Sequence, residues 1–367
     1  MKEDDVNLRI PGPTPCPEEI LEAMSRPMRN YRGASMKGLV EGLYGKLSRY
    51  LETAHEVVLL TASGTGGLEA AVANLTSPGD RVLGVSAGVF GERFCAVAEA
   101  YGRSVERLSV EWGRAADPGE LRKALAREKS AAALLLTHNE TSTGIAHPIE
   151  ELVKTARKES DALVCVDAIS SLGAMPLPMD ELGIDLVVTG SQKAWGVPPG
   201  MAILFLGPRA VAALEKTEGP RFYFDLRRYR KAKDKGNFPF TPAISLVYAL
   251  DVALDRLLKE TRARVYARHE RLAEAARSKV RALGLEFFGD ERHLSRTVTA
   301  IRLPEGVDEP ALMDLLRTKY RCVLARGQER LQGKIVRVGH LGFVEEPEIE
   351  SAVEALGAAL GDMGVSV

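Results

Sequence analysis

The chain has 367 residues, of which 45% are hydrophobic and 27% are charged, a balance that excludes a disordered or fibrous protein. Its 49 Lys and Arg residues nearly cancel its 50 Asp and Glu residues, so no overall charge favours binding to nucleic acid or to an anionic membrane. Four widely spaced cysteines without a C-x-x-C pair predict neither a disulfide framework nor a metal site.

The usual targeting signals are missing from the sequence. The N-terminus, MKEDDVN, is acidic and lacks the basic-then-apolar pattern of a signal peptide. No uncharged apolar run approaches the roughly 18 residues that a membrane-spanning helix needs. We therefore expect a cytoplasmic protein that does not contact a membrane.

The predicted elements begin after an N-terminal segment, residues 1–15, whose Pro-Gly-Pro-Thr-Pro motif predicts extended chain rather than a helix or strand. From about residue 55 to 206, short runs rich in β-branched residues alternate with longer segments of helical periodicity. This alternation is typical of βαβ units, and it predicts an α/β fold with a mostly parallel sheet sandwiched by helices. The predicted strands are 57–61, 81–86, 131–137, 162–167, 185–189 and 201–205, and the predicted helices are 66–75, 91–101, 119–128 and 149–160.

The pattern changes after residue 242 to that of a smaller α+β domain. Two long helices come first, at 243–259 and 262–283. We accordingly predict a large domain at residues 16–255 and a small C-terminal domain at 256–367. The further elements expected in the small domain are strands at 297–303, 322–325 and 335–338 and helices at 309–319 and 347–360.

Three predicted strands of the large domain end on residues that could bind a ligand, because ligands of open parallel sheets sit beyond the carboxyl ends of the strands. Ser63-Gly-Thr opens a helix and is either a simple helix cap or a cradle for a phosphate group. Asp167 ends an apolar strand and is either a structural partner or a fixed anion that faces a cationic ring nitrogen. Lys193 is either solvated or a buried lysine whose lowered pKa would let it form a Schiff base.

One ligand could use all three groups. Pyridoxal phosphate would place its phosphate on the turn at Ser63, its ring nitrogen on Asp167 and its aldehyde on Lys193. Each signal is weak alone, but the combination predicts a pyridoxal 5'-phosphate enzyme.

Several longer motifs run through nearly the whole chain in a fixed order. They are Pro11-Gly-Pro-Thr-Pro, Ser63-Gly-Thr-Gly-Gly-Leu-Glu-Ala-Ala, Asn139-Glu-Thr-Ser-Thr-Gly, Val166-Asp-Ala-Ile-Ser-Ser-Leu-Gly, Gly190-Ser-Gln-Lys-Ala, Phe240-Thr-Pro-Ala-Ile-Ser and Arg337-Val-Gly-His-Leu-Gly. With these motifs the sequence resembles the class V (fold type I) aminotransferases, in particular the group of alanine–glyoxylate, serine–pyruvate and serine–glyoxylate aminotransferases.

The resemblance implies a catalytic role for two residues. Lys193 would carry the cofactor as an aldimine and would then move a proton between the substrate and the cofactor. Asp167 would keep the ring nitrogen protonated. In addition, Arg337 would bind the substrate α-carboxylate with its bidentate fork.

The resemblance also implies a set of cofactor-binding residues. Ser63, Gly64, Thr65 and Gln192 would hold the phosphate, together with Thr241 of the partner subunit, since these enzymes build two sites across a homodimer interface. The remaining contacts would be Thr141 near the 3'-oxygen, Ile169 on one face of the ring and Phe90 stacked on the other face.

The chain departs from the family pattern in two places. Phe90 stands where a Trp or another aromatic residue usually stacks, which keeps the π face but loses the indole N–H. Residues 31–33 read Tyr-Arg-Gly where relatives often have His-Arg-Ser, and this difference affects the expected substrate preference.

The leading hypothesis is a transaminase that moves the amino group of alanine or serine to glyoxylate or pyruvate by a ping-pong mechanism. A lyase or cysteine desulfurase with the same cofactor is the main alternative, although Gln192 precedes the lysine where desulfurases usually have His, and Cys322 lies in an apolar strand. A branch of relatives named as soluble hydrogenase subunits and a non-catalytic relative are further alternatives. The basic and aromatic segment 221–235 favours a loop over the active site of the partner subunit rather than a nucleic-acid patch, and His138 and His340 are expected to be structural.

Overall fold

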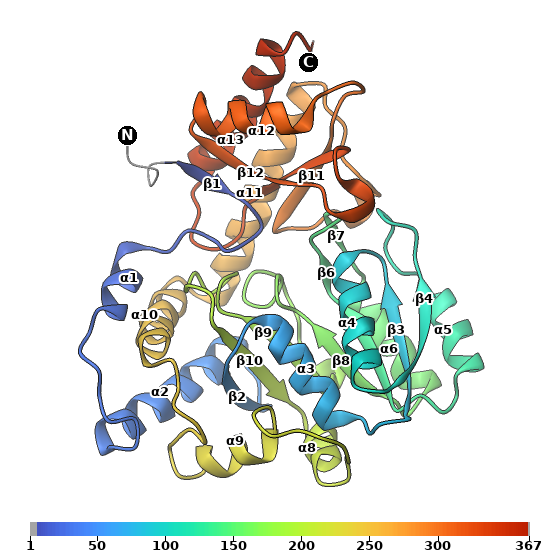
Figure 1. Cartoon of the computed structure of the whole chain (residues 1–367), viewed down its shortest axis with the longest axis vertical. Coiled ribbons are helices and arrows are strands. Elements are labelled where there is room, and N and C mark those ends of the chain that lie inside the picture. The colour runs from blue at the N-terminus through green and yellow to red at the C-terminus, as the bar shows by residue number, and fades with distance from the viewer. Residues whose placement is uncertain (1–5, 366–367) are drawn as a thin grey trace.

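A computed structural model describes residues 6–365 of the chain (Figure 1). Its large domain is built on a seven-stranded sheet with the strand order β2-β10-β9-β8-β5-β3-β4. β10 is antiparallel to both of its neighbours, and the other pairs are parallel, which confirms the predicted mostly parallel α/β architecture. The strands are β2 (Glu56–Thr61), β3 (Arg81–Ser86), β4 (Ser104–Ser109), β5 (Ala133–Thr137), β8 (Leu163–Asp167), β9 (Leu186–Gly190) and β10 (Met201–Leu206).

Helices cover both faces of this sheet, because alternate residues of each strand point to opposite faces. In β5, Leu134 and Leu136 belong to the apolar core shared with α5 and α6, whereas Ala133 and Leu135 belong to the core shared with α3 and α4. Figure 1 shows α3 and α4 in front of the sheet. The helices of the large domain are α1 (Glu18–Met24), α2 (Ala34–Leu51), α3 (Gly64–Leu75), α4 (Val89–Ala100), α5 (Pro118–Arg127), α6 (Ile149–Glu159), α7 (Met179–Leu182), α8 (Pro208–Leu214), α9 (Leu226–Lys233) and α10 (Ile244–Glu260).

The small domain holds a four-stranded sheet with the strand order β1-β12-β13-β11. Its long helix α11 (Arg262–Ala282) continues directly from α10, and Figure 1 shows it rising out of the large domain. The other elements are β1 (Asn7–Arg9), β11 (Val298–Arg302), β12 (Cys322–Arg326), β13 (Ile335–Gly339), α12 (Glu309–Thr318), α13 (Glu346–Asp362) and the 3₁₀ turns η1 (Glu291–His293) and η2 (Glu329–Leu331). The boundaries proposed above at residues 16 and 256 stay a prediction.

The N-terminal segment differs from the prediction, since Asn7–Arg9 forms a true strand, β1. It pairs in parallel with β12, and Arg9 Nη2 donates a hydrogen bond of 2.9 Å to Glu348 Oε1 of α13. Its partners lie more than 300 positions away in the sequence, so no local pattern could indicate this strand.

The basic segment 221–235 also differs from the prediction, because α9 occupies its middle. Asp225 caps this helix by accepting a hydrogen bond from the N–H of Arg227, and Leu226 and Tyr229 bury one side of it. Among the helices that the structure describes, we find none long and apolar enough to cross a membrane.

Candidate active site

A cavity of about 250 Å³ lies at the carboxyl edge of the large sheet, where the loops after β2, β8 and β9 meet. This is the edge at which ligands of open α/β sheets bind. The cavity brings together nearly all of the residues that the sequence pointed to, namely Ser63, Gly64, Thr65, Phe90, Thr141, Asp167, Ile169, Gln192 and Lys193. It is also lined by residues that were given no role, which are Gly12, Leu68, Arg93, Asn139, Ser170 and Gln328.

The turn between β2 and α3 points the N-terminus of a helix at this cavity. Ser63 is the N-cap of α3, and its Oγ accepts a hydrogen bond of 3.3 Å from the N–H of Gly66. Glycine is required here for close packing, since a Cβ atom on Gly64 would lie 2.6 Å from Ile169 and one on Gly67 would lie 2.6 Å from Val188. The free N–H groups of the first turn and the helix dipole make this turn suitable for an anion such as phosphate.

Asp167 is the last residue of β8 and is buried at the floor of the cavity. Its Oδ1 accepts a hydrogen bond of 2.9 Å from the N–H of Ile169. No Lys, Arg or His nitrogen of residues 6–365 lies within ion-pair distance of the carboxylate, and burial raises the pKa of Asp167 to about 7. A cation placed next to this carboxylate would therefore be strongly stabilised.

Lys193 lies in the loop after β9 and is held by the N-terminal segment. Its Nζ donates a hydrogen bond of 2.6 Å to the carbonyl of Pro11, and the Thr14 hydroxyl donates one of 3.1 Å to the Lys193 carbonyl. Burial and, to a smaller extent, the nearby charge of Arg337 lower the pKa of Lys193 to about 8. At neutral pH an appreciable fraction of this amine is uncharged and nucleophilic.

Phe90 lies in the first turn of α4, and its ring faces the cavity together with the guanidinium of Arg93, 4.9 Å from the ring centroid. The N–H groups of Phe90 and Gly91 each donate a hydrogen bond of 3.0 Å to Glu140, a buried residue of the short strand β6 (Asn139–Glu140). Sequence reasoning gave Glu140 no role, because nothing local connects it with a helix that begins 50 residues earlier.

Arg337, in β13, does not line the cavity directly but lies behind Thr141. Its Nη1 donates a hydrogen bond of 2.9 Å to the Thr141 carbonyl, and its Nη2 donates one of 2.7 Å to the Arg326 carbonyl. The side chain is buried, which lowers the pKa of Arg337 to about 10. Each Nη nitrogen carries a second N–H, and that pair of donors could form a fork for a carboxylate.

Other expected residues lie outside the cavity. Thr241 is exposed just before α10, and residues 31–33 lie before α2. His138 and His340, which were expected to be structural, are both buried. His340 Nε2 lies 3.0 Å from the Thr299 hydroxyl.

Residues that line the cavity carry buried polar atoms without a partner among residues 6–365. Three buried amide oxygens that belong to residues lining the cavity have no hydrogen-bond partner within the described chain: Asn139 Oδ1, Gln192 Oε1 and Gln328 Oε1. Such orphaned atoms are uncommon in folded proteins and indicate a missing polar partner. An anion site, an unpaired carboxylate and a nucleophilic lysine around one cavity match the phosphate, the ring nitrogen and the aldehyde of pyridoxal phosphate.

Comparisons with known proteins identify relatives of the whole chain. A family model described as aminotransferase class-V matches residues 6–339. The chain is 34% identical over 368 residues to a serine–glyoxylate aminotransferase of Hyphomicrobium methylovorum, with 98% of this chain and 91% of the relative covered. It is also 38% identical over 364 residues to a protein of Synechococcus sp. (strain PCC 6716) named as the small subunit of a soluble hydrogenase, with 99% and 94% covered.

Among solved structures, the alanine–glyoxylate aminotransferase of Nostoc sp. is similar over most of its length. It superposes with a TM-score of 0.93 at 30% sequence identity, and 98% of this chain and 96% of that chain are covered.

Proposed function

The chain belongs to the class V aminotransferase family, and we propose that it transfers the amino group of alanine or serine to glyoxylate or pyruvate. It is thus a pyridoxal-phosphate-dependent transaminase, in which the donor and the acceptor react in turn at one site. The observation that carries the substrate proposal is the cavity of about 250 Å³, which also has to hold the cofactor and therefore favours substrates with short side chains.

The cofactor would be held by groups that surround the cavity on all sides. We assign the phosphate to the N-terminus of α3 at Ser63, Gly64 and Thr65, with Gln192 nearby. The ring would lie between Phe90 and Ile169.

Asp167 and Thr141 would then contact the edge of the ring. A protonated ring nitrogen beside Asp167 would supply the cation that this buried carboxylate lacks. When bound, pyridoxal phosphate acts as an electron sink for the negative charge that develops at the substrate Cα.

Lys193 is the residue that we assign to proton transfer. Its pKa of about 8 is close to neutral pH, so the amine can accept a proton from the substrate Cα and can also return one. The hydrogen bond from Nζ to Pro11 fixes the end of an otherwise flexible side chain at the cavity.

Arg337 would anchor the substrate α-carboxylate with its two remaining Nη donors. Because its other donors are fixed on the carbonyls of Thr141 and Arg326, the fork would be oriented before the substrate arrives. This anchor would place the Cα of any amino acid at the same point, so the side chain would be selected by the rest of the cavity.

We further propose a homodimer that uses the aromatic surface around residues 222–223. Phe222 is 66% exposed and Tyr223 is 37% exposed, and Tyr223 stacks on Phe240 with ring centroids 5.0 Å apart. Exposed aromatic rings with arginine neighbours are typical of interface hot spots. Thr241 directly follows Phe240, so this surface would bring Thr241 to the cofactor site of the partner subunit.

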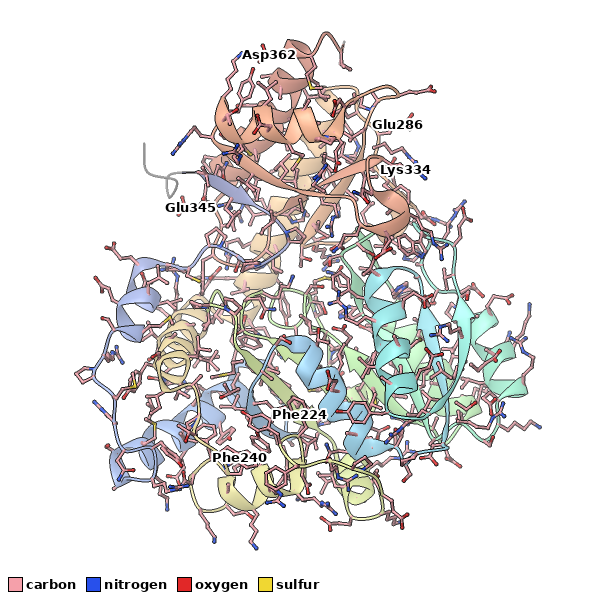
Figure 2. All side chains as sticks on the ribbon, viewed as in Figure 1. Phe224, Phe240, Glu286, Lys334, Glu345 and Asp362 are labelled. Carbon is pink, nitrogen blue, oxygen red and sulfur yellow. The ribbon has the colours of Figure 1, made fainter. Side chains whose placement is uncertain are left out.

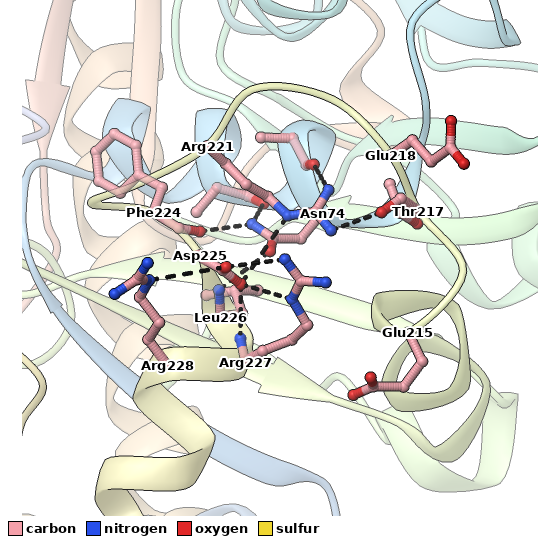
Figure 3. A network of polar contacts seen from close by, with 12 residues as sticks. Asn74, Glu215, Thr217, Glu218, Arg221, Phe224, Asp225, Leu226, Arg227 and Arg228 are labelled. Atoms are coloured by element: carbon pink, nitrogen blue, oxygen red, sulfur yellow. Dashed lines mark hydrogen bonds and ion pairs between the residues drawn. The ribbon is translucent and has the colours of Figure 1, made fainter.

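The segment that carries these rings is anchored by a polar network (Figure 3). Asn74, buried in α3, donates a hydrogen bond to the Phe224 carbonyl and accepts one of 3.0 Å from the N–H of Leu226. The carboxylate of Asp225 accepts hydrogen bonds from Arg227 and also lies within 4.0 Å of Arg221 and Arg228. A surface segment fixed in this way loses little entropy when it binds a partner.

The desulfurase alternative would require a nucleophilic cysteine. Cys322 is 1% exposed in β12, and burial raises the pKa of its thiol to about 11, so this thiol is a poor nucleophile at neutral pH. These properties favour the transaminase.

An absorbance spectrum of the holoenzyme tests the proposed function. We expect the cofactor band to shift when alanine or serine is added alone and to return when glyoxylate or pyruvate follows. A band that no small amino acid shifts would contradict the transaminase substrates, and a protein that gives no band after incubation with pyridoxal phosphate would contradict the assignment of Lys193.

A further inference from the structure

Glu140 is a fully buried ionisable residue that the proposed mechanism does not use. It is 0% exposed and lies in β6, next to the cavity residues Asn139 and Thr141. The hairpin that β6 forms with β7 (Ile145–Ala146) fixes its backbone. A buried carboxylate is costly unless its environment stabilises it, so its contacts need an explanation.

Both carboxylate oxygens of Glu140 accept hydrogen bonds, and three of the donors are backbone N–H groups, which can only donate. Oε2 accepts bonds of 3.0 Å from the N–H groups of Phe90 and Gly91. Oε1 accepts a bond of 3.2 Å from the N–H of Ser142 and a second bond from the Ser142 hydroxyl. Burial raises the pKa of Glu140, and the hydrogen bonds from Ser142, Gly91 and Phe90 oppose this rise because they favour the charged form.

The carboxylate of Glu140 completes the start of α4. The N-cap of α4 is Gly88, which has no side chain and makes no side-chain cap. Glu140 supplies the missing acceptor from a different element, where the helix dipole also favours a negative charge. The Glu140 carboxylate occupies the place that a side chain at the N-cap would need, because a Cβ atom on Gly88 would lie 2.5 Å from Glu140 Cδ.

The first turn of α4 carries Phe90 into the cavity. Two consecutive N–H groups bonded to one oxygen fix both the start and the rotation of the helix, and thereby the direction of the Phe90 ring. The charge of the same carboxylate favours the protonated form of Asp167 and of Arg337: it adds to the effect of burial on the pKa of Asp167 and partly opposes the lowering of the pKa of Arg337 by burial.

We propose that Glu140 is a positioning residue, whose buried carboxylate caps α4 and holds the Phe90 ring against the face of the cofactor. The capping itself depends only on the observed contacts, whereas the effect on the cofactor rests on the proposed function. Glu140 does not touch the reacting atoms, and its influence passes through Phe90.

The test compares Glu140→Gln with Glu92→Gln. Both variants exchange a carboxyl group for an amide at the first turn of α4, but Glu92 pairs with Arg107 and makes no bond to the N–H of Phe90. In the apoprotein, hydrogen exchange of the peptide over residues 88–94 should be at least about tenfold faster in Glu140→Gln, since the amide offers a single acceptor oxygen to the N–H groups of Phe90, Gly91 and Ser142, and its NH2 group can only donate. Glu92→Gln should exchange like the wild type.

In the holoenzyme, Glu140→Gln should raise the dissociation constant of pyridoxal phosphate by roughly tenfold and reduce the visible circular dichroism of the cofactor band. Ser142→Ala keeps the carboxylate but loses the hydroxyl, which donates to Glu140 and accepts a bond of 3.0 Å from the N–H of Val89. It should give a smaller change in cofactor affinity and dichroism, and it provides a second reading if Glu140→Gln folds poorly. Wild-type exchange in both Glu140→Gln and Ser142→Ala would overturn the capping. Faster exchange with unchanged affinity and dichroism would overturn the positioning role, whereas a wild-type protein that binds no cofactor would instead contradict the proposed function.

Discussion

The Nζ atom of Lys193 donates a hydrogen bond of 2.6 Å to the carbonyl of Pro11, a residue 182 positions earlier in the chain. The same N-terminal segment continues the strand β1, which belongs to the small-domain sheet. The backbone N–H of Thr14 adds a bond of 3.1 Å to the Gln192 carbonyl in the lysine loop. Lys193 is therefore tied through a short stretch of chain to the small domain.

A substitution at Gly12 should damage the site without unfolding the protein. A Cβ atom on Gly12 would lie 2.5 Å from Lys193 Nζ, and the φ angle of +131° favours glycine. Because a displacement of about 1 Å in a reacting group can cost roughly 100-fold in rate, we expect Gly12→Ala to lose at least about tenfold in kcat/KM for alanine. Steady-state kinetics measure this loss.

Gly42→Ala is the matched control for Gly12→Ala. Gly42 lies in α2 with no atom within 4 Å of its virtual Cβ, so alanine should leave the activity unchanged and raise helix stability by about 0.5–1 kcal/mol. Equal activity of the two variants would contradict the close contact at Lys193.

Asp167 should make the stability of the apoprotein depend on pH. Its pKa is raised by burial from 3.8 to about 7, so between these values the folded chain holds a proton that the unfolded chain has lost. Apoprotein stability should therefore fall as the pH rises from about 4 through 7. Asp167→Asn should remove this loss and make the apoprotein roughly 2 kcal/mol more stable at pH 8, as measured by urea denaturation.

A second buried carboxylate gives the opposite expectation. Asp185 is ion-paired with Arg157 and accepts a hydrogen bond of 2.7 Å from the N–H of Val164. Asp185→Asn should therefore destabilise the protein at pH 8. If both variants lose stability there, Asp167 has a cationic partner within the chain and its assigned role is incorrect.

Arg337→Ala should separate substrate binding from cofactor binding. The cofactor would keep its contacts at α3, Asp167 and Lys193, while the α-carboxylate would lose a charge-assisted fork. We expect the apparent dissociation constant of alanine, from spectral titration, to rise at least about 30-fold. Arg337→Lys should recover only part of the lost alanine affinity. Loss of the cofactor with unchanged alanine affinity would refute the assignment of Arg337 to the substrate carboxylate.

The local chemistry of the site was accessible from the sequence because the fold itself brings it together. Asp167 ends a buried strand, Ser63 and Lys193 each closely follow one, and parallel strands of one sheet place their carboxyl ends at one edge. That these three residues lie close together could therefore be predicted from the strand pattern alone.

Residues whose roles depend on distant partners were missed. Glu140 acts on a helix 50 residues away, and Pro11 meets Lys193 through the pairing of β1 with β12. α9 escaped detection because only Leu226 and Tyr229 are buried within a strongly basic run, too few to show a helical period. In each case the decisive contact is non-local, and single-sequence patterns carry no such signal.

The aromatic surface offers a last test, of the proposed homodimer. Phe222 is the most exposed large apolar side chain among the described residues, and it is covered in part by the guanidinium of Arg228, 4.6 Å from its ring. Replacing it with a charged residue should raise the dimer dissociation constant at least about 30-fold if the ring is a buried hot spot. Sedimentation of Phe222→Glu over a range of concentrations measures this change.

Glu286→Ala serves as the control for Phe222→Glu, because Figure 2 places Glu286 on the small domain, far from Phe224 and Phe240. Its sedimentation should match that of the wild type. If Thr241 of the partner subunit contributes to the phosphate site, the Phe222→Glu monomer should also bind pyridoxal phosphate several-fold more weakly, since it loses one hydrogen bond to a charged group. A monomeric variant that keeps the wild-type cofactor affinity would remove Thr241 from the site, and a wild-type chain that is itself monomeric would remove the dimer.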